Sequence, residues 1–171
     1  MSNYIQGNLI HLLYHNGTTW KTFGYAQNNS LNLSNETTSI SSKDHGLNPE
    51  TSVTGSSFSL SGECYFTADN AKVILGMHEK KTPFSFAFAQ VDQTDYAAGL
   101  KAVSGADNGA EAWTIAAAPF IRYGNGLVTS APITANNGEV ATLSIEITGS
   151  GAMSKSVMSN IKSYTDASDN Q

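Results

Sequence analysis

The sequence predicts a mainly β protein, a β-sandwich or flattened barrel of about eight strands with one flanking α-helix and a long inter-strand loop. Three observations predict this fold class. Several segments alternate apolar and polar residues with a period of two, as half-buried strands do. Asn-Gly pairs, which favour tight hairpin turns, stand at three joints between such segments. One segment, which begins at Thr67, combines helical spacing with a capping residue.

Length and composition indicate one domain over residues 1–171, with a polar C-terminal tail over residues 149–171. Charged residues make up 13% of the chain and the net charge is −5. A protein that grips nucleic-acid phosphates needs a basic surface, and this chain has Arg122 as its only arginine. The N-terminus lacks the basic start of a signal peptide and no window resembles a membrane helix, so we expect a cytoplasmic protein without a membrane partner.

The first part of the chain predicts a hairpin. Gly7 to Tyr14 is apolar at both parities, as in a strand buried on both faces. Asn16-Gly17 follows as the turn. Thr18 to Tyr25 returns as a second strand that places Trp20 and Phe23 on opposite faces.

The segment from residue 28 to residue 66 predicts two strands around a long loop. Leu31 and Leu33 share one face of the first strand. The second strand places its apolar residues on one face: Phe58, Leu60, Gly62, Cys64 and Phe66. Cys64 is the only cysteine, so we interpret it as a small buried hydrophobe. Glu36 to Gly55 has few large apolar groups, and we predict a polar loop there.

A helix and a strand follow this segment. Thr67 caps the predicted helix, and Pro83 ends it after two lysines that suit the negative end of the helix dipole. Phe84 to Val91 alternates three phenylalanines with small residues, which predicts a strand that contributes strongly to the core.

The last part of the chain predicts a connection and three strands. Asp92 to Ala112 is interpreted as the connection. The three strands are predicted at Trp113–Tyr123, Leu127–Ala135 and Glu139–Thr148, with turns at Asn125-Gly126 and Asn137-Gly138. In the polar tail, Met153, Val157 and Ile161 form a faint helical stripe.

No catalytic, cofactor-binding or metal site is predicted. The histidines have no carboxylate cluster or second cysteine beside them. Residues 149–156 resemble a phosphate-binding loop only in part, because Ser154 stands where the second glycine is needed. Serine and threonine are so frequent that no catalytic nucleophile can be selected.

The order of the segments resembles a known family. SLNLSNET at residues 30–37 is followed by TSISSKDHG at residues 38–46 and by the strand pattern SFSLSG at residues 57–62. This order resembles the major tail tube proteins of long-tailed, siphovirus-like bacteriophages. The resemblance covers residues 7–91 by motif and the remaining strands by pattern. Leu47 stands where a typical member has an aromatic residue.

The resemblance implies a structural virion protein with no enzymatic activity and no cofactor. Such subunits form hexameric rings that stack into a hollow tube, together with other tail proteins, and double-stranded DNA passes through the lumen without specific binding. It implies assembly in the host bacterial cytoplasm and a final location in the virion tail. The long loop would contact a neighbouring subunit through these residues: Glu36, Thr38, Ile40, Lys43, Asp44, His45, Leu47 and Val53.

Two further expectations accompany the resemblance. Glu63 and Glu146, on the polar faces of predicted strands, are candidate lumen acids, because like charge lets DNA slide without adhering. The alternative function is a monomeric carbohydrate-binding β-sandwich module, in which Trp20, Trp113 and Tyr123 would be stacking platforms. An enzyme is the third alternative.

Overall fold

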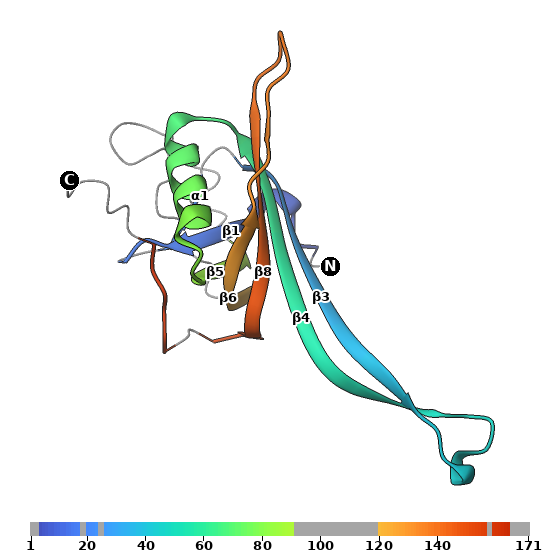
Figure 1. Ribbon diagram of the computed structural model, residues 1–171. Helices are drawn as coiled ribbons and strands as arrows, with labels where there is room; N and C mark the ends of the chain where they lie inside the picture. The colour runs from blue at the N-terminus through green and yellow to red at the C-terminus, as the bar shows by residue number, and fades with distance from the viewer. Residues whose placement is uncertain (1–3, 18–19, 24–25, 91–119, 157–158, 165–171) are drawn as a thin grey trace.

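The computed structural model describes residues 4–17, 20–23, 26–90, 120–156 and 159–164. Within them, one antiparallel sheet of eight strands is accompanied by one α-helix (Figure 1). The elements are η1 (Gly7–Leu9), β1 (Ile10–His15), β2 (Trp20–Thr22), β3 (Ala26–Ile40), η2 (Lys43–His45), β4 (Glu50–Tyr65), α1 (Ala68–Lys80), β5 (Phe84–Gln90), β6 (Ile121–Ser130), β7 (Ile133–Thr134) and β8 (Thr142–Ser154). The mainly β fold class is thereby confirmed.

The strands follow the order β2-β1-β5-β6-β8-β4-β3, and β7 pairs with β8. The sheet curls, so that two strands far apart in this order approach each other. Asn29 on β3 donates a hydrogen bond from Nδ2 to the backbone oxygen of Ile10 on β1, at 3.2 Å. The curled sheet and α1 together enclose the core.

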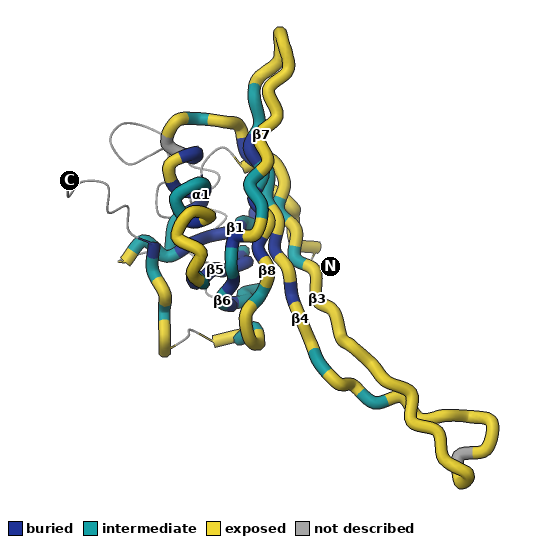
Figure 2. Tube along the Cα trace, in the orientation of Figure 1, coloured by how far each residue is buried: buried dark blue, intermediate teal, exposed yellow. Residues whose placement is uncertain are grey.

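The core lies between the inner face of the sheet and α1 (Figure 2). Ile74 and Met77 on the helix are fully buried against strand residues. The helix begins as predicted, because the Thr67 side chain accepts a hydrogen bond from the Asn70 backbone N–H at 3.1 Å. Lys81 ends it with a left-handed backbone, φ 53°.

Strand β5 is buried on both faces. Its phenylalanines belong to the main core, with Phe86 fully buried. Ala87 and Ala89 pack on the other side, in a second cluster with Leu13 and Tyr123. The alternation of large and small residues therefore reflects two layers of different depth.

Two of the three predicted Asn-Gly turns are confirmed. β1 and β2 pair around Asn16-Gly17, and the chain turns at Asn137-Gly138 between β7 and β8. The turn predicted at Asn125-Gly126 is wrong, because β6 runs straight through both residues and pairs with β5 there. Asn125 lies inside the sheet because its Oδ1 accepts a 2.7 Å hydrogen bond from the Ser85 hydroxyl.

The C-terminal residues extend the fold beyond the prediction. β8 continues past Thr148 to Ser154, so residues 149–154 belong to the sheet and not to a tail or a helix. Residues 159–164 return to the body, where the Ser85 backbone N–H donates to the Lys162 oxygen at 2.8 Å and the Tyr164 N–H donates to the His15 oxygen at 2.9 Å. The connection predicted at Asp92–Ala112, Trp113 and Val157 lie outside the described residues.

Candidate assembly surfaces

The most prominent surface feature is a two-stranded ribbon that extends far from the body (Figure 1). We call residues 36–55 the arm and residues 41–49 its tip. The arm consists of the outer halves of β3 and β4. None of its described side chains is buried, and Figure 2 shows it almost entirely in the colour for exposed residues. The arm has no core of its own.

The prediction of an irregular loop over Glu36–Gly55 is therefore wrong for most of its length. Glu36, Thr38 and Ile40 lie on β3, and Val53 lies on β4. Their strands remain paired to the end, with Ile40 opposite Glu50. Inter-strand backbone hydrogen bonds and β-branched residues support this ribbon without burial. The prediction failed because it took burial as the condition for a strand.

The other predicted contact residues lie at the tip. Lys43, Asp44 and His45 form the short 3₁₀ helix η2. Gly46 follows with φ 59°, in the range that favours glycine. Leu47 comes next and is 98% exposed. A leucine so fully exposed gains nothing from this single chain, which marks the tip as a contact surface.

An extra residue in β4 decides which side chains share a face of the arm. Glu36 pairs with Gly55, but Thr37 pairs with Val53, so Thr54 is a bulge. The Thr54 hydroxyl donates to the Glu36 backbone oxygen at 3.2 Å. Because the register moves by one residue, Val53 lies on the same face as Leu33. These two residues are 61% and 60% exposed, and Ile40 lies on the opposite face.

A second apolar surface lies at the other end of the molecule. We call residues 131–141 the upper hairpin, which projects away from the arm (Figure 1). Phe66 lies at its base, where its backbone N–H donates to the Ala141 oxygen at 2.8 Å. The apolar end patch consists of four exposed side chains: Tyr65, Phe66, Ile133 and Val140. Sequence reasoning missed this patch, although Ile133 and Val140 flank the predicted Asn137-Gly138 turn, where no core can cover them.

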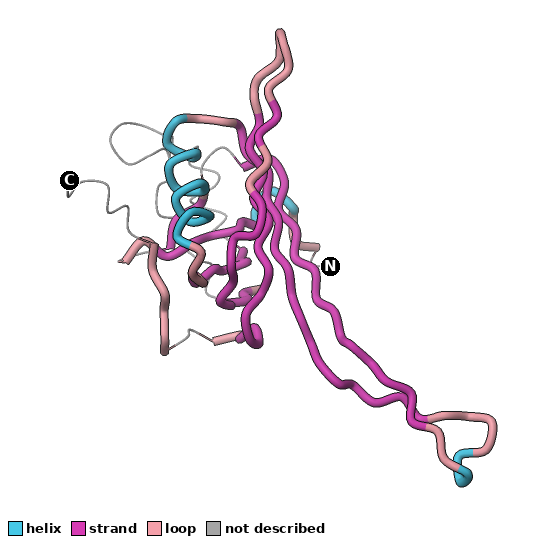
Figure 3. The backbone as a smooth tube through the Cα atoms, in the orientation of Figure 1, coloured by secondary structure: helices cyan, strands magenta, loops and turns pink. Residues whose placement is uncertain are grey.

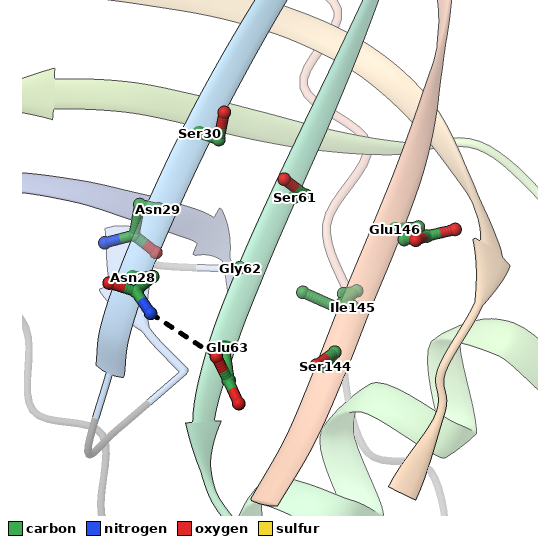
Figure 4. Close-up of a pocket in the computed structure, with 9 residues that line it drawn as sticks. All are labelled: Asn28, Asn29, Ser30, Ser61, Gly62, Glu63, Ser144, Ile145 and Glu146. Atoms are coloured by element: carbon green, nitrogen blue, oxygen red, sulfur yellow. Dashed lines mark hydrogen bonds between the residues drawn. The ribbon is translucent and has the colours of Figure 1, made fainter.

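The two candidate lumen acids lie on one face of the sheet. Glu63 pairs with Ser144, and Ser61 pairs with Glu146, so both carboxylates are on the face opposite Leu60 and the core. The Asn28 side chain donates to Glu63 Oε2 at 3.3 Å. They border a shallow hollow of about 220 Å³ (Figure 4). Its lining comes from β3, β4 and β8: Asn28, Asn29, Ser30, Ser61, Gly62, Glu63, Ser144, Ile145 and Glu146.

The structure offers little for covalent or metal chemistry. The described residues contain no group of three His, Cys, Asp or Glu side chains that could hold a metal ion. Burial raises the pKa of the Cys64 thiol to about 11, so it is a poor nucleophile at neutral pH. Burial lowers the pKa of His11 and His15, which favours the neutral imidazole. In the described part of the chain, no helix has the length and apolar character to cross a membrane.

The aromatic residues proposed as carbohydrate platforms do not form one. Tyr123 is 5% exposed, and its ring packs against Trp20 with the centroids 5.4 Å apart. Trp113 lies outside the described residues. The Trp20–Tyr123 contact belongs to a small core cluster, shown by the strand positions in Figure 3 to lie within the sheet body.

Comparison with known proteins gives a result for the structure but not for the sequence. No protein-family model matches the sequence, and a search of curated proteins finds no match. Among solved structures, the tail of an empty GTA particle with C6 symmetry matches with a TM-score of 0.64 at 15% identity, over 90% of this chain and 100% of that chain. The virion of a native gene transfer agent particle matches with a TM-score of 0.58 at 14% identity, over 88% and 98%.

A third structure agrees with these two. The SPP1 tail tube matches with a TM-score of 0.60 at 10% identity, over 86% of this chain and 77% of that chain. The curled sheet, its flanking helix and its outer ribbon thus recur in assembled tails. This chain has the fold of phage tail tube proteins.

Proposed function

We propose that this chain is a structural virion protein that assembles into stacked hexameric rings, which form a hollow tail tube for genome passage. The observation that carries this proposal is the arm, an exposed ribbon with apolar residues that no part of the same chain covers. Supporting it, the similar GTA tail was solved with C6 symmetry. The proposed location is the virion tail, after assembly in the host cytoplasm, and no enzymatic role is proposed.

The face that bears Glu63 and Glu146 is proposed to line the lumen. Its other side chains in the hollow are small and polar, from serine and asparagine. The net charge of −5 also favours weak attraction to DNA. Double-stranded DNA would pass such a surface without specific binding, because a wall of neutral and acidic groups does not neutralise phosphates.

Removal of the arm tests the proposal. Asn35 and Ser56 pair directly, so residues 36–55 can be replaced by Asn-Gly to give a two-residue hairpin. We expect this variant to fold with an unchanged core and to remain a monomer, as measured by circular dichroism, sedimentation and negative-stain microscopy. Wild-type protein and the tip variant Asn48→Ser should form rings and tubes. Tubes from the armless variant, or a wild type that stays monomeric at every concentration, would contradict the proposal.

A further inference from the structure

The exposed apolar residues of the described chain are concentrated at its two ends. At one end is the arm, where Leu47 at the tip is 98% exposed and Ile40 is 46% exposed. At the other end is the apolar end patch, where Val140 is 69% exposed and Phe66 is 38% exposed. The arm and the upper hairpin project in opposite directions from the body (Figure 1). Each surface lacks a partner that the same chain could reach.

We propose that the apolar end patch receives the arm tip of a second copy of this chain, so that copies contact one another head to tail. This inference rests on the proposed tube and identifies the receiving surface of its ring-to-ring contact. Leu47 would pack against Val140 and Phe66 of the next copy. The contact covers both exposed apolar surfaces at once and leaves each copy free to contact one neighbour at each end.

Symmetry favours this arrangement over contact between two arms. A contact between identical patches is isologous and closes at a dimer. Such a dimer would cover the two tips and leave both end patches exposed to water. A contact between two different patches is heterologous and repeats, which is what a stack requires. The presence of two apolar surfaces at opposite ends is the geometry of the second case.

The charges of the two surfaces are complementary. The upper hairpin contains one charged residue, Glu139, which accepts a 2.9 Å hydrogen bond from the Asn136 side chain. The tip carries the cation Lys43, with Asp44 beside it. Lys43 at the rim of the contact can approach Glu139 of the next copy while Leu47 lies at its centre. A polar rim around an apolar centre is the usual arrangement of a protein interface.

Cysteine cross-linking in the full chain tests the direction of the contact. The variants are Leu47→Cys, Val140→Cys and the chain that carries both, treated with a short flexible bismaleimide. The native Cys64 is 3% exposed and does not compete for the reagent. The chain with both substitutions should give a ladder of covalent multimers on denaturing gels. A mixture of the two single variants should stop at dimers, and each single variant alone should give none.

The control and the imaging of the same samples separate the possible failures. Leu47→Cys combined with Glu79→Cys on the exposed surface of α1 should give no ladder. Dimers from Leu47→Cys alone would show contact between two arms and overturn the inference. Tubes in the microscope without a ladder from the double variant would overturn the inference and leave the proposed tube intact. Absence of both tubes and ladder would count against the tube as well.

Discussion

Phe58 and Leu33 lie directly opposite each other on β4 and β3, yet Phe58 is 4% exposed and Leu33 is 60% exposed. This pair marks the boundary between the body and the arm. Beyond it, β4 no longer pairs with β8, whose contact begins at Ser59. The Phe58 ring lies over the backbone of Gly124 and Gly149, where side chains would come within 2.7 Å of it. Phe58 therefore fastens the arm to the core.

Substitution of Gly149 by alanine should weaken this junction. An added Cβ would lie 2.5 Å from the Phe58 ring, so the ring or the strand must move. We expect a loss of roughly 1–3 kcal/mol, the usual cost of overpacking a core. Urea unfolding measures it. The control is Gly55→Ala, where the nearest atom is a flexible Glu36 oxygen at 3.4 Å. Equal stability of the two variants would contradict this account of Phe58.

Substitution of Tyr164 by alanine should release the C-terminal segment from the body. The buried Tyr164 ring packs edge-on against Phe84 at 5.5 Å, and the Lys80 ammonium lies 4.9 Å from its centroid. We expect trypsin cleavage after Lys162 to accelerate roughly tenfold or more, the factor that about 1.4 kcal/mol of docking energy gives. Tyr164→Phe keeps the ring and should be cleaved at close to the wild-type rate. Resistance of the alanine variant would mean that backbone bonds alone hold the segment.

The Cys64 thiol should make stability fall at high pH. Burial raises its pKa from 9.0 to about 11, so the folded protein holds the proton more tightly than the unfolded chain. The contribution is therefore complete below pH 9 and is lost as the pH rises toward 11. Urea unfolding across this range should give a steeper decline for wild type than for Cys64→Ala. Parallel curves would show that the thiol titrates alike in both states.

A cysteine at Glu146 should reveal which side of the tube this face takes. In monomers, the exposed position should react with both a small maleimide and a large polymer-linked maleimide. In tubes, we expect the small reagent to enter the lumen and react, and the large one to be excluded. Glu79→Cys on α1 provides the comparison. Labelling by the large reagent in tubes would place the residue outside, and protection from both would place it within a subunit contact.

The sequence predicted the core better than it predicted the surfaces. The alternation around Leu60 and Ile145 identified buried faces correctly, because burial imposes a period of two on the residue types. The capping role of Thr67 was equally readable, since a cap depends on only three neighbouring residues. These signals are local, and the structure confirms them.

The failures have a common physical cause. Asn125-Gly126 has the residues of a tight turn, but Gly126 serves close packing, since a side chain there would collide with Ile147. The face occupied by Val53 depends on the bulge at Thr54, and a count of alternate residues gives the opposite face. In both cases the deciding contact comes from a strand distant in the sequence, which a pattern within one segment does not contain.

The paired strands of the arm give it a defined length. A slack loop would span a range of distances, whereas a ribbon advances about 3.3 Å for each residue, or roughly 23 Å between Leu33 and Ile40. If neighbouring copies meet through this ribbon, it acts as a spacer that sets the axial period of the assembly. Insertion of two residues into each strand would then lengthen that period by about 7 Å, so the pitch of the particle would be written in the number of residue pairs along one hairpin.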